Sequence, residues 1–548
     1  MSKTAYFDKE ARDALIKGLD LVADAVKSTL GPAGQTVVIQ KADKDPVITK
    51  DGVSVAREIS PKDEKVKLGA DLAISIAKKQ LNTVGDGTST ATVLGREIVK
   101  NGMAQLSLMD RAINCTSLRK GIEKAKDVVI KGLEENSKKI ENDDQLINVA
   151  TISANGDEKL GRVVAEAYKK VGKDGVVTVE ETKDRDIHLE FKAGMTFDRG
   201  WTSQYFVNNP EEQTVEYDRP IVVLANTKIS NLATLFELIK SPVEQGKPVV
   251  VIAESFDSSV IFGIATNIFR SGGAVKIACV EAPGFGDNRL ETLRDIAIYT
   301  GAKVGDDPMG TKFEAMTSAD FGTCDKIVIK KDETVITGFQ GNKSELDARI
   351  SSLNGLIAQY ENKPNNYEKE LYTKRLARLT TGVAVIRVGG SSEEEIKELK
   401  DRLDDAQCAV KAALEEGYLP GAGNTLLYLS EKAEMPKYDN DDEKLGGEIF
   451  FKSIKAPFKA IIENAGVTPD NIMKEVLSKN DITYGYNSKT LEFGNLIEMG
   501  VIDPTKAVKG SIYAAASIAG TILTSSVIIT QDPIEQSNVS LNASTMPY

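Results

Sequence analysis

The chain has 548 residues, too many for one hydrophobic core, so we expect several domains. Hydrophobic residues make up 41% and charged residues 27% of the chain, as in ordinary soluble globular proteins. The net charge of −12 argues against a nucleic-acid or anionic-membrane partner, and no apolar run approaches the roughly 20 residues that span a bilayer.

The N-terminal segment "MSKTAYFDKEARDALIKGLDLVADAVK" carries charges of both signs along an amphipathic helix. A signal peptide needs an uninterrupted apolar stretch and a transit peptide avoids acidic residues, so we expect a cytoplasmic protein. Four cysteines lie far apart with no CxxC motif, which predicts free thiols in a reducing compartment. The single histidine, His188, lies in an alternating strand and has an expected structural role. Any chemistry must therefore rely on carboxylates, hydroxyls and backbone amides.

The first third of the chain is predicted to be mainly helical. A helix over 11–30 carries Leu15, Leu19, Val22 and Val26 on one stripe and ends before the Gly-Pro pair at 31–32. Short strands follow over 36–40 and 46–49. An amphipathic helix that contains Leu68, Leu72 and Ile76 then precedes a glycine-containing loop, and another helix is expected over 91–100.

The middle third changes character. The apolar runs "RPIVVLA", "KPVVVIAE" and "GAVKIACVEAP" are each followed by a helical or loop segment, which indicates an α/β layer with parallel strands. The last third is helical again. We therefore expect one discontinuous helical domain with the α/β block inserted in it. Glycines on both sides of the block are candidate hinges: Gly172, Gly175, Gly382, Gly389 and Gly390.

The loop "GDGTSTATVL" from Gly85 suggests phosphate chemistry without a known nucleotide motif, because neither GxxxxGK[ST] nor GxGxxG occurs in the chain. Gly87 permits close approach of the backbone to an anion at a helix start. Asp86 would repel phosphate unless a cation intervened, so it is a candidate Mg²⁺ ligand. A simple capped helix start remains an equal alternative on the loop alone.

The predicted helix around 393–416 carries a second candidate carboxylate. Its buried stripe passes through Leu403 and Ala406, and Asp404 lies on the polar face. Asp405 lies instead on a flank beside Cys408, where a carboxylate is better placed to position a water molecule. On this pattern alone a structural role for Asp405 is the simpler interpretation.

Eight ordered motifs carry a resemblance to a known family. They are "TLGPAGQTVVI", "ITKDGVSVAREI", "GDGTSTATVL", "ATISANGDE", "GMTFDRGW", "APGFGDNR", "YGYNSKT" and "MGVIDPTKAV". Together they closely resemble the group I chaperonins, the GroEL-like family, from about residue 5 to about residue 530. The resemblance implies a multidomain α+β fold. Its parts would be a mostly helical equatorial ATP-binding domain (1–134 and 416–548), a small α/β intermediate hinge domain (135–192 and 384–415) and an inserted α/β apical substrate-binding domain (193–383).

The resemblance also implies a nucleotide site for ATP, Mg²⁺ and K⁺. Asp405 would activate the hydrolytic water with Asp51 close to it, and Asp86 would hold Mg²⁺. The nucleotide-binding residues would be Thr29, Leu30, Gly31, Pro32, Lys50, Asp86, Gly87, Thr88, Ser89, Thr90, Gly421, Ala422, Asn487, Ser488, Lys489 and Asp503. Two positions depart from the family: Ala422 replaces a glycine, which is tolerable only if its φ is negative, and Lys489 replaces a small residue.

The apical match implies a surface that grips unfolded polypeptide, which requires exposed apolar residues. The matching positions are Trp201, Tyr205, Phe206, Phe236, Ile239, Ile261, Ala265 and Thr266. On helical spacing alone, ordinary core packing is the favoured explanation for the two apical helices.

Two features of the resemblance concern assembly. Bacterial cytosolic members usually end in a flexible Gly-Met tail, whereas this chain ends "SNVSLNASTMPY". The segment "KAIIENAGVTPDN" lacks the expected acid at Thr468 opposite a basic residue such as Lys459. The number of rings, one or two, is therefore an open question.

The function implied is an ATP-dependent chaperonin that folds polypeptides inside a heptameric ring, with unfolded clients and a co-chaperonin lid as partners. Two alternatives stay open: a ring-forming holdase or scaffold with weak ATPase activity, and a soluble Mg-ATP phosphotransferase.

Overall fold

The computed structural model describes residues 3–41, 44–108, 113–172, 175–182, 186–210, 212–360, 367–380 and 382–531. The C-terminal segment "SNVSLNASTMPY" lies outside the described residues. The chain forms two compact units. Unit 1 comprises 1–166, 183–186 and 388–548, and unit 2 comprises 167–182 and 187–387. The finer division into three domains stays a prediction.

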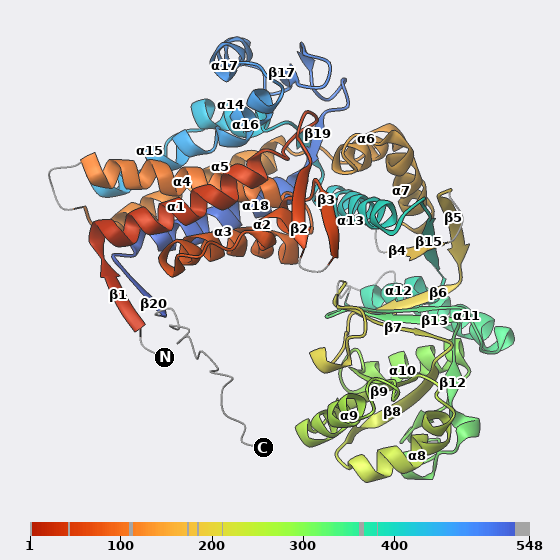
Figure 1. Ribbon diagram of the computed structural model, residues 1–548. Helices are drawn as coiled ribbons and strands as arrows, with labels where there is room; N and C mark the ends of the chain where they lie inside the picture. The colour runs from red at the N-terminus through yellow and green to blue at the C-terminus, as the bar shows by residue number, and fades with distance from the viewer. Residues whose placement is uncertain are drawn as a thin grey trace, which may run out of the picture. The chain divides into compact units, whose positions relative to one another are not determined.

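Unit 1 is mostly helical (Figure 1). In its first part the structure has β1 (Lys3–Phe7), α1 (Asp8–Lys27), β2 (Val37–Lys41), β3 (Lys44–Thr49), α2 (Gly52–Glu58), α3 (Glu64–Thr83), α4 (Thr88–Leu108), α5 (Cys115–Asn136), α6 (Asp143–Ser153) and α7 (Glu158–Val171), which runs on into unit 2. Its second part has α13 (Glu393–Glu416), β16 (Tyr418–Pro420), α14 (Asn424–Lys432), α15 (Asp441–Ser453), α16 (Ala456–Asn464), α17 (Pro469–Ser478), β17 (Tyr484–Asn487), β18 (Glu492–Asn495), β19 (Ile502–Pro504), α18 (Thr505–Thr524) and β20 (Val527–Gln531).

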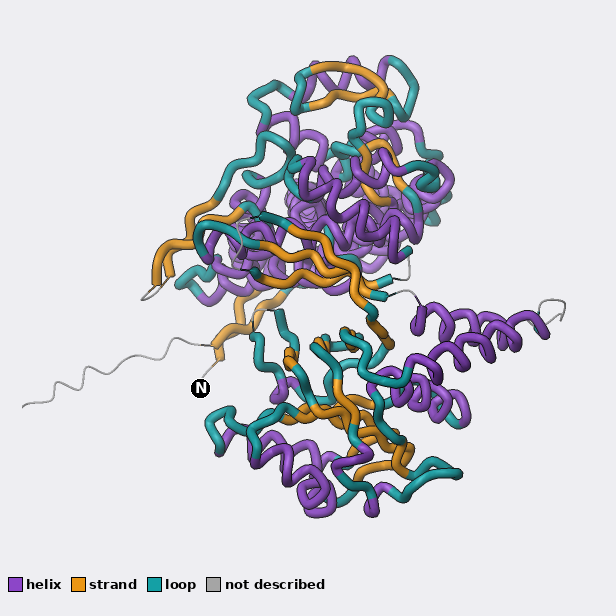
Figure 2. Tube along the Cα trace, turned by 90° about the vertical axis from the view of Figure 1, so that its right-hand side faces the viewer, coloured by secondary structure: helices purple, strands orange, loops and turns teal. Residues whose placement is uncertain are grey.

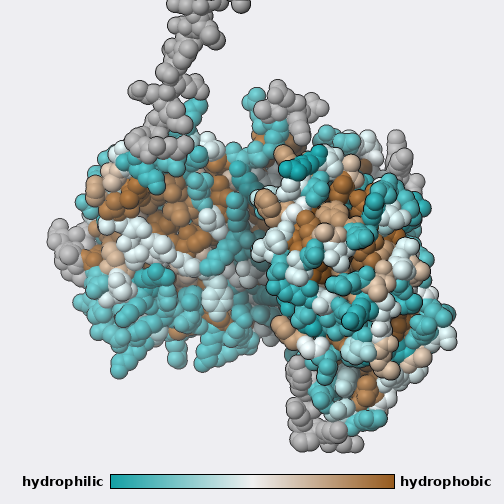
Figure 3. Space-filling model, turned by 90° about the horizontal axis from the view of Figure 1, so that it is seen from below, coloured by the Kyte–Doolittle hydropathy of each residue, from teal (hydrophilic) through white to brown (hydrophobic). Residues whose placement is uncertain are grey.

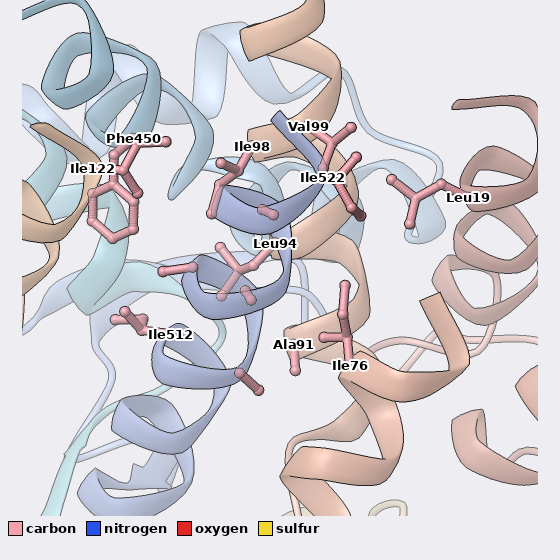
Figure 4. Close-up of a cluster of buried hydrophobic side chains, with 14 of the residues drawn as sticks. Leu19, Ile76, Ala91, Leu94, Ile98, Val99, Ile122, Phe450, Ile512 and Ile522 are labelled. Atoms are coloured by element: carbon pink, nitrogen blue, oxygen red, sulfur yellow. The ribbon is translucent and has the colours of Figure 1, made fainter. Parts of the chain in front are cut away.

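The core of unit 1 joins helices from both ends of the chain. Leu19 of α1, Ile76 of α3, Leu94 of α4, Ile122 of α5 and Ile512 of α18 meet in one buried cluster (Figure 4). Each of these helices is amphipathic, and burying its apolar stripe against the others stabilises the bundle. The predicted discontinuous helical domain is therefore confirmed.

Unit 2 is built on sheets. The structure has β4 (Val176–Glu181), β5 (His188–Lys192), β6 (Gly194–Phe197), β7 (Val215–Asp218), β8 (Ile221–Ile229), α8 (Leu232–Glu244), β9 (Val249–Phe256), α9 (Ser258–Arg270), β10 (Ile277–Glu281), α10 (Asp287–Thr300), β11 (Val304–Gly305), β12 (Gly322–Thr323), β13 (Lys326–Ile329), β14 (Thr334–Thr337), α11 (Lys343–Gln359), α12 (Tyr367–Thr380) and β15 (Val383–Val388).

The central sheet of unit 2 has the order β10-β9-β8-β11, with parallel pairing throughout and β12 added antiparallel to β8. Its strands are continuous buried apolar runs, because helices flank the sheet (Figure 2). The predicted parallel α/β layer is thus confirmed. A second sheet of order β6-β14-β13-β7 is antiparallel, and a third has the order β4-β15-β5.

Candidate nucleotide site

A cavity of about 400 Å³ lies within unit 1, in the size range of small-molecule sites. It is formed where α1 ends, where α2 and α4 begin, and along one side of α6 and α13. Every residue predicted to bind nucleotide or catalyse hydrolysis lines this cavity, except Gly421. Gly421 lies directly behind the lining, where a Cβ atom would come within 2.9 Å of Asp503 Oδ1.

The glycine loop is held open by two left-handed residues, Gly85 (φ 86°) and Gly87 (φ 78°). Between them, Asp86 Oδ1 accepts the Gly87 N–H at 2.6 Å, and Oδ2 accepts the Ser153 hydroxyl at 3.4 Å. Helix α4 begins immediately afterwards at Thr88. The loop therefore presents a carboxylate and a helix N-terminus to the same cavity.

Asp51 caps helix α2. Its Oδ1 accepts the Val53 N–H at 3.2 Å, and its Oδ2 accepts the Ser54 N–H at 2.8 Å. This cap fixes the carboxylate at the cavity wall and stabilises the short helix. This structural role was not predicted, although an acid directly before a helical run is a known capping signal.

Asp405 lies on α13 and lines the same cavity. Burial raises the pKa of its carboxyl well above the ordinary range, and the nearby carboxylates of Asp86 and Asp51 raise it further. Burial likewise raises the pKa of Asp86. Carboxylates that repel one another in a buried cavity favour either a proton or a cation between them.

Asp503, in β19, completes the acidic group. Burial and the charge of Asp86 raise the pKa of its carboxyl to about 7, although the N–H groups of Gly423 and Ala422 donate to it. Lys50 lines the same cavity. Burial lowers the pKa of its amine, and the positive charge of the nearby Arg402 lowers it further.

The expectation of a negative φ at Ala422 is wrong. Its φ is 56°, in the left-handed region, whereas a methyl group was expected to be tolerable only at negative φ. The turn is kept because the residue's N–H donates to Asp503 and because Gly423 follows, itself left-handed with φ 70°. The alanine therefore carries backbone strain at the cavity wall.

Several lining residues were not predicted. From α6 and the turn after it come Asn148, Thr151, Ile152, Ser153, Asn155 and Gly156, and from α13 come Glu398, Asp401 and Arg402. The motif "ATISANGDE" contained part of the first group but was assigned no role. Arg402 precedes Asp405 by three residues on one helix, so the helical period itself would have found it.

The donor set suits a cation that is shared with phosphate. Within the described ranges, no group of three or more His, Cys, Asp and Glu side chains is placed to hold a metal ion by itself. Mg²⁺ is usually held by one or two carboxylates together with phosphate oxygens, and the mutual repulsion among these buried carboxyls is what such a cation relieves. Asp86 is the residue that fits this role.

The predicted polypeptide-binding residues all lie in unit 2, but they differ in exposure. Tyr205 is 76% exposed, whereas Phe206 and Ile239 are only 2% and 0% exposed and belong to the core. The expectation that these two form part of an exposed face is corrected: both side chains pack against the central sheet. Trp201, Phe236, Ile261, Ala265 and Thr266 are half-buried.

The most exposed apolar residues of α9 were missed. Phe262 is 72% exposed and Phe269 is 87% exposed, and they lie seven residues apart, on one face of the helix. Figure 3 shows apolar residues gathered on the face of unit 2 that is seen from below. The predicted positions on α9, Ile261, Ala265 and Thr266, are half-buried instead, because helical spacing alone does not say which stripe of a helix is buried.

The structure also places the four cysteines and His188 and bears on membrane-spanning helices. None of the four cysteines, all within the described residues, forms a disulfide; Cys279 and Cys324 are buried, and Cys115 and Cys408 are half-buried. His188 is exposed on β5. In the part of the chain that the structure describes, no helix has the length and apolar character needed to cross a membrane.

Comparison with known proteins identifies the family. A profile of the TCP-1/cpn60 chaperonin family matches residues 22–533. The fold is similar to that of the chaperonin gp146 from the bacteriophage EL 2 (Pseudomonas aeruginosa), solved in the presence of ATP-BeFx, with a TM-score of 0.69 and 21% identity over 96% of this chain and 99% of that chain. That likeness confirms the predicted GroEL-like fold. Because the family profile covers nearly the whole sequence, this chain belongs to the TCP-1/cpn60 chaperonin family.

Proposed function

We propose that this ATP-dependent folding chaperonin binds and hydrolyses ATP in the cavity of unit 1, with Asp405 as the residue that orients and activates the attacking water. The observation that carries the proposal is the convergence of Asp51, Asp86, Asp405 and Asp503 on one cavity beside a glycine loop and a helix N-terminus. A carboxylate with a raised pKa can accept the proton of an attacking water near neutral pH.

The other residues would bind the nucleotide. The amides and hydroxyls at Thr88, Ser89 and Thr90 suit phosphate oxygens, Gly87 lets the backbone approach them, and Lys50 offers a positive charge beside them. Asn487, Ser488 and Lys489 line another part of the cavity, where we place the base. The Ser488 hydroxyl is buried and has no hydrogen-bond partner among the described residues, so a ligand atom can satisfy it.

We assign Mg²⁺ to Asp86 and the bound phosphates, with K⁺ beside them. Mg²⁺ neutralises phosphate charge when it is bound. Asp86 is prepared for this role because the Gly87 N–H and the Ser153 hydroxyl orient its carboxylate. Asp51 is held at the same wall by its capping bonds.

We place client binding on unit 2. Tyr205, Phe262 and Phe269 supply exposed aromatic surface, which a soluble protein does not normally keep without a partner. Phe236 and Ile261 lie half-buried on α8 and α9 and would extend this surface. A co-chaperonin lid would compete for the same helices. ATP would release the client if it favours the state in which this surface is withdrawn.

Family membership implies oligomeric rings, and we propose rings of seven subunits. Two small sheets of unit 1 suit this assembly: β1 pairs only with β20, and β2 only with β3, among the described residues. Their outer faces expose Phe7, Ile529, Val38 and Ile48. Open strand edges with apolar faces favour pairing with the complementary sheet of a neighbouring copy. Cysteines that form no disulfide among the described residues fit a cytoplasmic location.

The experiment that tests the function combines phosphate release with refolding of a chemically denatured client. A folding chaperonin should hydrolyse ATP steadily without any small-molecule acceptor, and client refolding should require ATP. Client binding without an effect of ATP would indicate a holdase. ATP turnover that depends on an added acceptor would indicate a phosphotransferase, and either result would contradict the proposal.

A further inference from the structure

Gln80 is a fully buried amide in the last turn of α3, next to the glycine loop. Its Nε2 lies 2.5 Å from the Asp86 carbonyl oxygen and 3.1 Å from the Ala507 carbonyl oxygen of α18. Because both partners are acceptors, the amide nitrogen must face them and the orientation of the side chain is fixed. Gln80 therefore joins α3, the loop and α18.

Ser511 holds the next carbonyl of the same loop. Its Oγ lies 3.0 Å from the Gly87 carbonyl oxygen and 2.9 Å from the Ala507 carbonyl oxygen. Glycines make room for this arrangement. A Cβ on Gly510 would come within 2.6 Å of Gln80 Oε1, and a Cβ on Gly87 would come within 2.8 Å of Ser511 Oγ. The two side chains thus anchor consecutive loop carbonyls to the helices behind them.

This anchoring determines where the carboxylate of Asp86 lies. The Asp86 carbonyl and the Gly87 N–H belong to one planar peptide and point in opposite directions. With the carbonyl tied to Gln80, the N–H points the other way, and there it donates to Asp86 Oδ1 at 2.6 Å. Gln80 therefore orients the carboxylate through the intervening peptide.

A packing role alone does not account for Gln80. Its Oε1 is buried and has no hydrogen-bond partner in the described part of the chain, which is a cost that an apolar side chain of similar shape would avoid. The end of α3 does not need the side chain either, because the Val84 and Gly85 N–H groups already donate to the Gln80 backbone carbonyl. The two hydrogen bonds that the amide donates are what a methionine could not supply.

We propose that Gln80 and Ser511 are positioning residues for ATP hydrolysis, which hold the Asp86–Gly87 peptide so that the Asp86 carboxylate is ready for Mg²⁺-bound phosphate. This role rests on the proposed function, because it assigns Asp86 to the metal. It predicts that both side chains strengthen nucleotide binding in the presence of Mg²⁺ and leave binding without Mg²⁺ unchanged.

The test uses the full-length protein with Gln80→Met, Ser511→Ala and Asp86→Asn, and Ser453→Ala as the matched control. Ser453 is also a buried serine, and its Oγ lies 2.7 Å from the Ile449 carbonyl oxygen and 3.3 Å from the Glu97 carbonyl oxygen of α4, away from the cavity lining. Binding of ADP is measured by calorimetry with Mg²⁺ and with EDTA, and folding is followed by circular dichroism.

We expect Gln80→Met and Ser511→Ala to weaken ADP binding with Mg²⁺ by about tenfold or more, as is usual when the support of a metal ligand is lost. Binding in EDTA should stay within about twofold, and the Mg²⁺ concentration for half-maximal ATPase activity should rise. Ser453→Ala should resemble wild type in both conditions.

The role is overturned if Mg²⁺-dependent binding survives both substitutions while Asp86→Asn abolishes it, or if affinity falls equally with Mg²⁺ and with EDTA. Should Gln80→Met not fold, Ser511→Ala decides alone. Wild-type protein that binds no nucleotide would instead overturn the proposed function, together with this role.

Discussion

The backbone N–H of Ala422 donates to the buried carboxylate of Asp503, and it does so from a left-handed conformation with φ 56°. The turn that contains Ala422 lies at the wall of the nucleotide cavity. A residue with a Cβ is strained in this conformation, so the carboxylate holds the turn at a cost in stability.

Replacing Ala422 with glycine should therefore stabilise the protein. Glycine populates this region of φ and ψ freely, so the strain is relieved while the N–H stays available to Asp503. We expect a gain of about 1 kcal/mol in the free energy of unfolding. Thermal or denaturant unfolding of the nucleotide-free protein measures it.

Ala433→Gly is the control for that substitution. Ala433 follows α14 with φ −66°, where glycine only adds freedom to the unfolded chain. This variant should be slightly less stable than wild type. If Ala422→Gly lost stability to the same extent, the left-handed strain assigned to Ala422 would be disproved.

The contribution of Asp503 to the stability of the nucleotide-free protein should fall as the pH rises from about 4 to about 7. An unfolded aspartate titrates near pH 3.9, whereas the folded carboxyl of Asp503 has a pKa of about 7. In this window the folded state holds a proton that the unfolded state has lost, so each rise in pH favours unfolding. Asp86 and Asp405 act in the same direction, because burial raises the pKa of both carboxyls.

Asp503→Asn should remove part of this pH dependence. At pH 8 we expect it to raise the free energy of unfolding by on the order of 1–3 kcal/mol, because one pKa unit corresponds to about 1.4 kcal/mol. The effect should be small near pH 4. Asp71→Asn, at an exposed position of α3, is the control. A profile for Asp503→Asn that runs parallel to wild type at all pH values would refute the assignment.

Exposure separates two classes of substitution on unit 2. Phe262→Ser and Phe269→Ser should weaken the binding of a denatured polypeptide several-fold, because each removes exposed aromatic surface, and should leave the melting temperature near that of wild type. Ile239→Ser should instead lower stability by a few kcal/mol, since it places a hydroxyl in the core. Client binding by light scattering and thermal melts distinguish the two.

The opposite pattern would move the binding surface. If Phe262→Ser and Phe269→Ser bound a denatured client as wild type does, the exposed face of α9 would not be the client site, and the half-buried residues of α8 would have to carry it.

Native mass spectrometry tests the ring. Seven copies of the 59.2 kDa chain would weigh about 414 kDa, and a double ring would weigh about twice as much. Either mass supports the ring assembly. Which of the two masses is found shows whether the segment around Thr468 and Lys459 joins two rings. Val38→Lys with Ile48→Lys should reduce the ring to smaller species, because both residues lie on the exposed face of the β2–β3 sheet. A monomer under every nucleotide condition would contradict the ring.

The sequence predicted the elements that carry a strong periodic pattern. The amphipathic helices with Leu19 and Ile76 and the apolar strands β8, β9 and β10 are present as expected, because burial of a stripe or a run is a local property of the residues. Residues that line the cavity were also predicted from the ordered motifs, because each motif specifies the conformation of its own loop.

What the sequence did not predict depends on tertiary contacts. Whether Ile239 or Phe262 faces outward depends on which side of α8 or α9 packs against the sheet. The spacing of apolar residues shows only that they share one face of the helix. The left-handed φ of Ala422 depends on Asp503, 81 positions further along the chain. The anchoring of the loop by Gln80 likewise requires α18 from the other end of the chain.

The most direct test of the account is ATP hydrolysis and client refolding by Asp405→Asn beside Asp404→Asn. The two residues are adjacent on α13, but only Asp405 lines the cavity. We predict that Asp405→Asn lowers the rate of phosphate release by about 10²–10⁴-fold, while nucleotide binding is kept, and that it abolishes ATP-dependent refolding. Asp404→Asn should behave as wild type. Undiminished hydrolysis by Asp405→Asn would contradict the central claim that this carboxylate activates the attacking water.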